Sequence, residues 1–387
     1  MSILGTFSAT QFIDQHWQKE PLLIRQALTL PTPIIDPDEL AGLACEDDVE
    51  SRLVQCDAQQ AHWQCEDGPF DETRFATLAS SHWTLLVQGV DQHEPVIHAL
   101  LDHFAFLPRW RVDDIMISYA VDGGGVGAHY DHYDVFLLQL QGKRQWQIGQ
   151  RCDDTTPLRD DTPLKLLCEF HPREEYVLEA GDMLYLPPRL AHCGTALGDG
   201  CVTASIGYRS PSPRAVAERA LEMIAATLST NPGYRDTAPA IDADPFRINP
   251  AAMSVARAMG DAISPAQLAE ATARAFGTQV TESRHADLIH CDEPLDAATL
   301  DAHIRTLIQE DEPLVLEHHR ASRFAYANGD GDCVLFVDGE AHCATLAMAR
   351  GICHGHVAAD HLRTAIAPGA DHELLLRLIN QGSLIPS

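Results

Sequence analysis

The stretch GGGVGAHYDHYDVFLLQL, residues 123–140, contains two consecutive pairs of a histidine and an aspartate. His129 and Asp131 form the first pair, and His132 and Asp134 form the second. A histidine and a carboxylate two positions apart on a strand share one face and can bind one metal ion. Two histidines and one carboxylate on one side of a metal leave other positions open, as iron(II) oxygenases require. The stretch therefore predicts a metal site that needs a second histidine.

His192 is the candidate for that second histidine. It follows a turn, a short apolar strand and a Pro-Pro pair in GDMLYLPPRLAHCG, residues 181–194. A histidine after such a turn is often an ordinary surface residue, so its pairing with an earlier His-x-Asp carries the assignment. Adjacent antiparallel strands can bring residues that are 63 positions apart within metal-bonding distance. We therefore expect His192 to lie beside one of the two pairs.

Side-chain alternation does not choose between the pairs, because each pair has its own shared face. The glycines at 123–127 favour the first pair, since they permit close approach of the backbone just before His129. Asp134 directly precedes the apolar run VFLLQL and is better interpreted as a strand-start or turn residue. We predict His129 and Asp131 as metal ligands, and His132 as a neighbour of the site.

An oxygenase of this kind usually takes two electrons from a 2-oxoacid, and a cation must bind the far carboxylate of that cosubstrate. Arg144 follows the Gly142-Lys143 turn after VFLLQL, and its planar guanidinium can donate two parallel hydrogen bonds to a carboxylate. Lys143 is the alternative cation, although a solvated turn position explains it more simply. Ser118, in the run MISYA, is a candidate for an additional hydroxyl contact.

The segments around these residues are typical of an all-β domain. Between residues 111 and 209, short runs rich in β-branched and aromatic residues alternate with Gly, Pro and Asp turns. These runs are DDIMISYAV, DVFLLQL, RQWQIG, EYVLEA, DMLYL and VTASIGYR. Many short strands at close spacing predict a barrel or a jelly roll. With the mixed helix and strand signals before residue 110, they predict a first domain over residues 1–210.

Helical signals define two further regions. Ser212-Pro213 and Ser264-Pro265 each place a capping serine before a proline at the first helical position, which predicts a helical domain over residues 211–284. A Pro- and Asp-rich loop at about 230–250 interrupts that domain. Residues 285–387 then show a helix (LDAATLDAHIRTLIQ), strands joined by turns, and a final helix (HELLLRLINQG), the order of a winged-helix-like α+β domain.

Charge is the strongest compositional signal. The chain has 56 acidic and 27 basic residues, only three of them lysines, and a net charge of −29. Such a surface repels nucleic-acid phosphates and anionic membranes and attracts a basic partner, although acidity for solubility alone is an equal alternative. Residues 286–387 contain six arginines, no lysine and 16 acidic residues, a net charge of −10, which disfavours nucleic-acid binding by the C-terminal region.

The remaining composition predicts a soluble cytoplasmic protein. No apolar run is long enough to span a bilayer, and the first residues lack a secretory signal. The 11 cysteines include no Cys-x-x-Cys pair, which favours reduced thiols over disulfides or a structural zinc site. A second cluster, Cys353-His354-Gly355-His356, has no further ligand pair nearby, and coincidence is its simpler interpretation.

Four segments resemble the bacterial JmjC-type ribosomal oxygenases, a family of ribosomal-protein arginine hydroxylases in the cupin superfamily. They are WQKEPLLIRQA (17–27), LPRWRVDDIMIS (107–118), GGGVGAHYDHYDVFLLQLQGKRQW (123–146) and GDMLYLPPRLAHCG (181–194). The resemblance is dense over the β domain, and the order of the two later regions is similar to that of the family. It implies a double-stranded β-helix, or jelly roll, for the catalytic domain.

The resemblance also implies function. Iron(II) would be bound by His129, Asp131 and His192, and 2-oxoglutarate by Arg144, with Ser118 as a second candidate contact. The family commonly has another residue type where His132 stands. The implied reaction hydroxylates an arginine β-carbon of large-subunit ribosomal protein sixteen, a basic protein that an acidic enzyme would attract. The helical domain would form a homodimer.

Three alternatives stay open on the sequence. The chain is either such an oxygenase or a cupin-like metal protein without oxygenase activity, which would hold zinc or no metal at the same residues. The same chemistry could act on a histidine of another ribosomal protein or on a methylated lysine. A winged-helix scaffold or regulator that binds nucleic acid is the third alternative, and the acidic C-terminal region argues against it.

Overall fold

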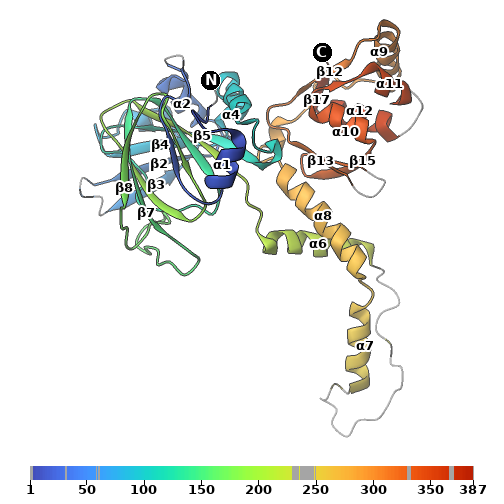
Figure 1. Cartoon of the computed structure of the whole chain (residues 1–387), viewed down its shortest axis with the longest axis horizontal. Coiled ribbons are helices and arrows are strands. Elements are labelled where there is room, and N and C mark those ends of the chain that lie inside the picture. The colour runs from blue at the N-terminus through green and yellow to red at the C-terminus, as the bar shows by residue number, and fades with distance from the viewer. Residues whose placement is uncertain are drawn as a thin grey trace. The chain divides into compact units, whose positions relative to one another are not determined.

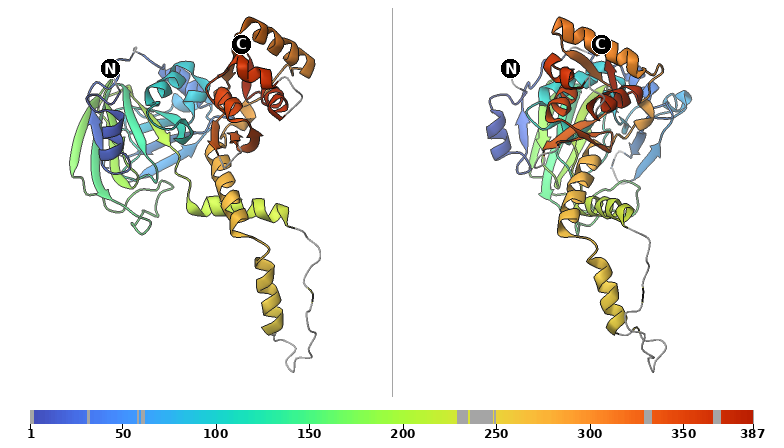
Figure 2. Two further views of the ribbon diagram at one scale, coloured as in Figure 1. Left: turned by 45° about the vertical axis from the view of Figure 1, so that its right-hand side comes forward. Right: turned by 90° about the vertical axis from the view of Figure 1, so that its right-hand side faces the viewer.

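The chain divides into two compact units, Met1–Ser210 and Pro211–Ser387, in the computed structural model (Figure 1). The first unit is mostly β, and the second combines helices with two small sheets (Figure 2). None of the described helices has both the length and the apolar character needed to cross a bilayer. The structure describes residues 3–30, 33–57, 59, 62–228, 235, 248, 250–328, 333–365 and 370–386.

Two antiparallel sheets form the first unit. The larger sheet has eight strands in the order β1 (Leu22–Ile24), β9 (Met183–Leu186), β6 (Val135–Gln141), β11 (Cys201–Tyr208), β5 (Val112–Ala120), β4 (Trp83–Val87), β2 (Ser51–Cys56) and β3 (Trp63–Asp67). The smaller sheet has three strands in the order β10 (Leu190–Ala196), β7 (Lys143–Arg151) and β8 (Glu174–Glu179). Each of the six predicted strand runs forms a strand, so the predicted mostly β domain is confirmed.

Short helices cover the larger sheet and close its hydrophobic core. They are α1 (Ala9–Gln15), α2 (Pro37–Leu43), α3 (Glu72–Phe75), α4 (Val90–His93), α5 (Pro95–His98) and the 3₁₀ segments Ala99–Phe104 and Arg109–Arg111. Ser8 and Gln11 form a capping box at the start of α1. Phe12 on α1 is fully buried, with its ring centroid 5.0 Å from that of Tyr185 and 5.6 Å from that of Phe136. These aromatic contacts hold the N-terminal arm, residues 9–18, against β9 and β6.

The segment between β5 and β6, residues 121–134, differs from the strand that the alternation argument assumed. It forms only isolated bridges, so the strand that the shared-face argument assumed is absent, although His129 and Asp131 do lie close together. Two glycines explain its course. A Cβ atom on Gly124 would lie 2.2 Å from the carbonyl oxygen of Trp83, and one on Gly125 would lie 2.3 Å from that of Gly194. Glycine lets the segment pack directly on neighbouring backbone.

Asp134, at the end of this segment, is a fully buried carboxylate and not a simple turn residue. It accepts hydrogen bonds from the Tyr185 hydroxyl at 2.6 Å, the Gln18 side-chain amide at 3.0 Å and the Arg111 guanidinium at 3.2 Å. Burial raises the pKa of Asp134, and these donors oppose that rise. The guanidinium of Arg111 also lies 5.4 Å from the Trp17 ring centroid. Asp134 therefore joins the N-terminal arm, β9 and the start of β6.

The second unit contains the predicted helices and more elements than the sequence predicted. Its helices are α6 (Pro213–Thr227), α7 (Pro250–Gly260), α8 (Pro265–Thr281), the 3₁₀ segment Ala286–Leu288, α9 (Ala297–Glu310), α10 (Leu346–Cys353), α11 (Ala359–Ala365) and α12 (Ala370–Asn380). Ser212 and Ser264 cap α6 and α8 as predicted. The predicted loop at about 230–250 lies outside the described residues, apart from Arg235, Ile248 and the first residue of α7.

Two three-stranded sheets complete the second unit. One has the order β16 (His356–Val357), β12 (Leu314–His318) and β17 (Leu384–Pro386), and the other has the order β13 (Phe324–Asn328), β14 (Cys333–Val337) and β15 (Glu340–Ala344). The first sheet, α10 and α11 were not predicted, because their segments are short and lack a clear period. Gly277 on α8 packs against the Phe336 ring of β14. A division of this unit near residue 284 stays a prediction.

We predict that Asp134→Ala lowers the free energy of unfolding of the first unit by about 3 kcal/mol, because it leaves Tyr185 and Arg111 with unpaired buried polar groups. Urea unfolding followed by tryptophan fluorescence measures this, since all five tryptophans lie before residue 211. Asp154→Ala is the control, because the Asp154 side chain is 74% exposed and its loss should cost less than about 0.5 kcal/mol. Equal stability of the two variants would contradict the role of Asp134.

Candidate metal centre

His129 and His192 face each other across two reciprocal backbone hydrogen bonds. The His129 amide donates to the His192 carbonyl at 3.0 Å, and the His192 amide donates to the His129 carbonyl at 2.9 Å. This isolated antiparallel bridge joins the irregular segment to β10, as the sequence argument for residues 63 positions apart predicts. The two ring centroids lie 4.3 Å apart.

Each imidazole is oriented by a hydrogen bond to the carbonyl two residues before it. His129 Nδ1 lies 3.0 Å from the Gly127 oxygen, and His192 Nδ1 lies 2.9 Å from the Leu190 oxygen. Since a carbonyl oxygen only accepts, each Nδ1 carries a hydrogen, and Nε2 is the ring nitrogen that faces the other side chains of the group. This is the way in which metal-binding histidines are commonly held.

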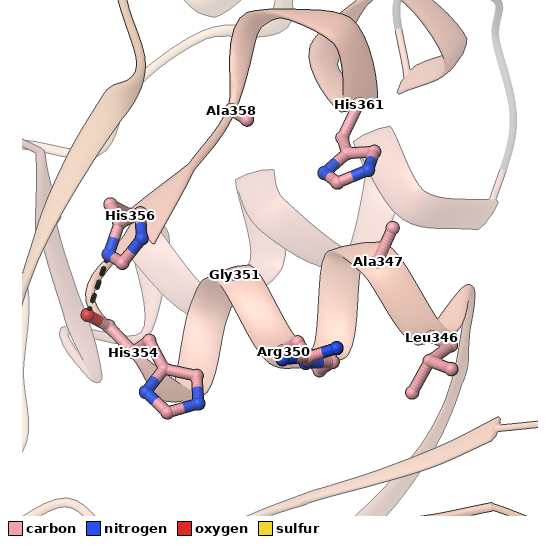
Figure 3. A pocket seen from close by; sticks show the side chains of 8 residues that line it. All are labelled: Leu346, Ala347, Arg350, Gly351, His354, His356, Ala358 and His361. Atoms are coloured by element: carbon pink, nitrogen blue, oxygen red, sulfur yellow. Dashed lines mark hydrogen bonds between the residues drawn. The ribbon is translucent and has the colours of Figure 1, made fainter.

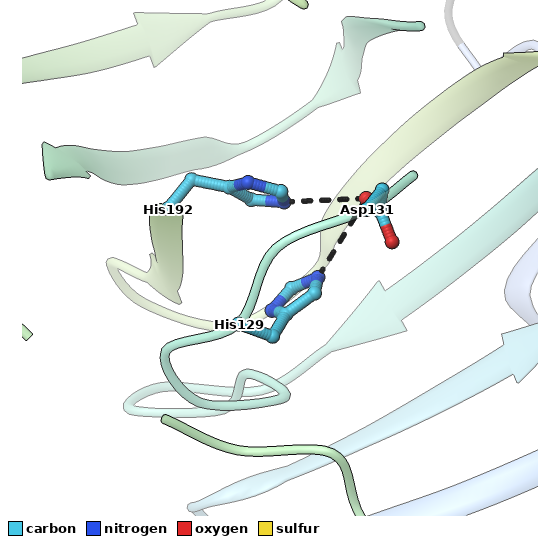
Figure 4. A group of neighbouring side chains, drawn as sticks. All are labelled: His129, Asp131 and His192. Carbon is cyan, nitrogen blue, oxygen red and sulfur yellow. Dashed lines mark ion pairs between the residues drawn. The ribbon is translucent and has the colours of Figure 1, made fainter. Parts of the chain in front are cut away.

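Asp131 completes the group (Figure 4). Its Oδ2 lies 3.6 Å from Nε2 of His192 and 4.0 Å from Nε2 of His129. The backbone carbonyl of Asp131 accepts a hydrogen bond from the Arg189 amide at 2.6 Å, so the turn after β9 fixes its position. The ligand atoms of these three side chains lie within 4.8 Å of one another. Among the described residues, no other set of three or more histidine, cysteine, aspartate or glutamate side chains lies close enough to hold a metal ion.

Burial keeps His192 neutral at physiological pH. The side chain is almost fully buried, and burial, followed by the nearby His129, lowers its pKa to about 4. A neutral imidazole with a free Nε2 lone pair is the form that binds a metal ion. Two imidazoles and one carboxylate on one side of a metal ion leave positions open for further ligands.

The second histidine–aspartate pair is separated from this group. His132 is exposed, and its Nδ1 lies 4.0 Å from Asp154 Oδ1 on the surface. Asp134 points into the core network described above. Of the two pairs, the structure therefore brings only His129 and Asp131 together with His192.

A cavity of about 550 Å³ lies between the two sheets of the first unit, with these three residues in its wall. Ser118 from β5 and Arg144 from β7 line the same cavity. Apolar side chains form much of the rest, among them Leu86, Met116, Val135, Leu137 and Trp146. Every candidate site residue predicted from the sequence therefore lies at one cavity.

Arg144 is a buried cation with spare hydrogen-bonding capacity. Its Nε donates to Cys201 Sγ at 3.4 Å, and its guanidinium carbon lies 5.7 Å from the Trp146 ring centroid. One terminal nitrogen of the guanidinium has no partner among the described residues. A buried charged donor without a partner is costly, so this nitrogen indicates an anionic ligand in the cavity. Lys143, by contrast, is exposed and pairs with Glu179 at 2.6 Å.

Ser118 on β5 and Thr203 on β11 line the cavity from the larger sheet, whereas Arg144 lines it from β7 of the smaller sheet. Ser118 is buried, and its hydroxyl donates only a long hydrogen bond of 3.4 Å to the Thr203 carbonyl. The Thr203 hydroxyl bonds to Gln139 at 3.0 Å. Sequence reasoning missed Thr203, Trp146 and Cys201. The alternation of Arg144, Trp146 and Ile148 along β7 could have indicated which face of that strand is buried.

The comparisons with known proteins concern the same unit. The JmjC domain family matches residues 99–216. The chain is 41% identical over 213 residues to the ribosomal protein uL16 3-hydroxylase of Escherichia coli, with 54% of each protein covered. It is 39% identical over 202 residues to a probable ribosomal oxygenase of Haemophilus influenzae, with 52% of this chain and 49% of the relative covered. The alignments thus span about half the length of the curated relatives.

Solved structures match over the whole length. The structure of YcfD, a ribosomal oxygenase from Escherichia coli, in complex with cobalt and 2-oxoglutarate has a TM-score of 0.78 and 29% identity, with 99% of each chain covered. The same protein in complex with cobalt and succinic acid has a TM-score of 0.77 and 30% identity, again over 99% of each chain. The mostly β first unit is thus a JmjC, cupin-like domain.

We predict that His129→Ala, Asp131→Ala and His192→Ala each weaken cobalt(II) binding at least about 100-fold. Loss of a residue that only orients a ligand costs roughly 10–100-fold, so loss of a ligand should cost more. Isothermal titration with cobalt(II), a stable substitute for iron(II), measures the affinity. His132→Ala is the matched control and should bind within about 3-fold of the unsubstituted protein. Weaker binding only in the His132 variant would reverse the choice of pair.

Proposed function

Because this chain belongs to the bacterial JmjC-type ribosomal oxygenases, we propose that it is an iron(II)- and 2-oxoglutarate-dependent dioxygenase that hydroxylates an arginine β-carbon of ribosomal protein uL16. The observation that carries the proposal is the placement of His129, Asp131, His192 and the unpaired nitrogen of Arg144 at one cavity. The YcfD structures with cobalt, 2-oxoglutarate and succinic acid support the same pair of cofactor and cosubstrate.

The residues at the cavity fit both iron(II) and 2-oxoglutarate. Two imidazoles and one carboxylate suit iron(II), and His129, Asp131 and His192 would hold it. When bound, iron(II) and 2-oxoglutarate together supply the oxidation of a carbon–hydrogen bond by dioxygen. The unpaired Arg144 nitrogen fits a carboxylate, which a guanidinium binds through two parallel hydrogen bonds.

Arg144 binds and orients the far carboxylate of the cosubstrate in this proposal. Cys201 and Trp146 hold the guanidinium in place, so little freedom remains to be lost on binding. The apolar wall residues Val135 and Leu137 exclude water and keep the local dielectric low, which strengthens the attraction between guanidinium and carboxylate. The Ser118 hydroxyl, whose present hydrogen bond is long, is available for a further contact.

The acidic chain suits a basic protein substrate. A net charge of −29 attracts a cationic protein over a Debye length of about 8–10 Å and speeds its encounter with the enzyme. The curated relative from Escherichia coli is named for uL16, and ribosomal proteins are commonly basic. The alternative acceptors, a histidine of another ribosomal protein or a methylated lysine, would use the same cavity.

We propose that the helical part of the second unit, residues 211–284, forms a homodimer and that residues 285–387 form a winged-helix-like domain without direct nucleic-acid binding. Large apolar side chains on α6, α7 and α8 are exposed and support an interface there: Leu221, Met253, Met259, Leu268 and Phe276. The net charge of −10 over residues 286–387 supports the second statement. Sedimentation as a monomer at micromolar concentration would contradict the dimer.

We predict that Arg144→Ala raises the KM for 2-oxoglutarate roughly 10–100-fold, the effect of losing a hydrogen-bonded charge pair. Succinate formation at varied 2-oxoglutarate concentration, followed by NMR, measures KM and kcat separately. Lys143→Ala is the matched control, because Lys143 is exposed and paired with Glu179, and it should leave KM unchanged. An unchanged KM in the Arg144 variant would exclude Arg144 as the carboxylate partner.

Intact-mass measurement of the large-subunit ribosomal proteins, from cells with and without this gene, tests the substrate. We expect uL16 to gain the mass of one oxygen atom only when the gene is present. Fragmentation of the modified protein then locates the oxygen on an arginine side chain. A mass change on another ribosomal protein would replace the substrate, and no change on any of them would leave the cupin-like metal protein as the better interpretation.

A further inference from the structure

A second cavity, of about 480 Å³, lies in the second unit between α10 and the segment that leads from β16 into α11 (Figure 3). Its lining combines four basic or imidazole side chains with small and apolar ones. The lining residues are Leu346, Ala347, Arg350, Gly351, His354, His356, Ala358 and His361. Part of this cluster, Cys353-His354-Gly355-His356, is recognisable in the sequence, where coincidence is its simpler interpretation.

The lining contains no carboxylate, although the surrounding region has 16 acidic residues against six arginines. The guanidinium of Arg350 has no hydrogen-bond or ion-pair partner among the residues that the structure describes, although its backbone carbonyl accepts from the His354 amide at 3.0 Å. Arg363 on α11 is the contrasting case, since it pairs with Asp360 at 3.1 Å and with Asp311 at 3.5 Å. The cavity is therefore a local excess of positive charge and hydrogen-bond donors on an acidic unit.

The imidazoles surround the same hollow (Figure 3). His354 and His356 have ring centroids 6.4 Å apart, and Nδ1 of His356 is held by the His354 carbonyl at 3.0 Å. His361 approaches from α11 on the other side of the hollow. Each ring supplies a polar nitrogen that can donate a hydrogen bond to a ligand.

Gly351 allows this arrangement. A Cβ atom at Gly351 would lie 2.8 Å from Cγ2 of Val357 and 2.9 Å from the His356 carbonyl oxygen. Glycine therefore lets β16 pack directly on α10, which brings His356 beside Arg350 and His354.

We propose that this cavity binds a small phosphate-bearing molecule. Arg350 would donate hydrogen bonds to the phosphate oxygens, and His354, His356 and His361 would surround the same anion. Leu346, Ala347 and Ala358 supply an apolar wall for the body of the ligand, and the volume lies in the range of small-molecule sites, about 300–1,000 Å³. A metal ion fits less well, because the guanidinium repels a cation and the ring nitrogens do not converge within 4.8 Å.

Titration of the full-length protein with inorganic pyrophosphate and with adenosine monophosphate, followed by calorimetry, tests the proposal. We expect Arg350→Gln to weaken binding of at least one probe about 10-fold or more, the usual effect of losing a charge-assisted hydrogen bond. The double variant His354→Ala/His361→Ala should weaken it as well. Arg363→Gln is the matched control on the neighbouring helix and should bind as the unsubstituted protein does. Arg350 is exposed, so its substitution leaves the fold intact, which circular dichroism verifies.

Arg144→Ala separates this site from the catalytic cavity, the other place where an anion could bind. Pyrophosphate binding that survives in Arg144→Ala and weakens in Arg350→Gln supports the proposal. Binding that is lost in Arg144→Ala and kept in Arg350→Gln assigns the anion to the first unit and overturns it. The proposal is also overturned if neither probe binds at millimolar concentration. In that case, tight zinc(II) binding that the double histidine variant loses would identify the cluster as a metal site.

Discussion

The reciprocal backbone hydrogen bonds between His129 and His192 are the constraint on which the candidate centre depends. They hold two segments 63 residues apart in one register, which places the two imidazoles side by side. Gly124 and Gly125 let the first segment lie against neighbouring backbone, and the turn through Arg189 fixes Asp131 from the other side. Main-chain hydrogen bonds thus position both histidines and Asp131.

A second constraint is electrostatic. Arg144 is a buried cation at the cavity, where a charge without a partner is costly. Cys201 and Trp146 offset only part of that cost, and one guanidinium nitrogen keeps its hydrogen-bonding capacity for a ligand. The same low dielectric that makes the free cation costly makes its attraction for a carboxylate strong. The chain as a whole carries a net charge of −29, opposite in sign to Arg144. A small anion inside the cavity and a basic protein on the surface would therefore bind to different parts of the molecule.

The N-terminal arm packs against the end of the same irregular segment. Asp134 lies three residues after Asp131 and is anchored by Tyr185, Gln18 and Arg111. Phe12 packs on Tyr185 and Phe136 beside this network. The two ends of the irregular segment are therefore fixed in different ways, by the glycine contacts at its start and by a buried polar network at its end.

The sequence by itself determined the mostly β class of the first unit, six of its eleven strands, the capped helices after residue 211 and the set of residues that gather at the cavity, because hydrophobic period, caps and residue type are local properties. The sequence also favoured His129 and Asp131 as the pair that meets His192, but only the tertiary structure shows the contacts that bring them there. The segment is irregular and not a strand, so its side-chain directions follow from backbone contacts with β4 and β10 that no local pattern encodes. The burial of Asp134 and the grouping of Arg350 with three histidines were likewise decided there, since each depends on elements distant in the chain.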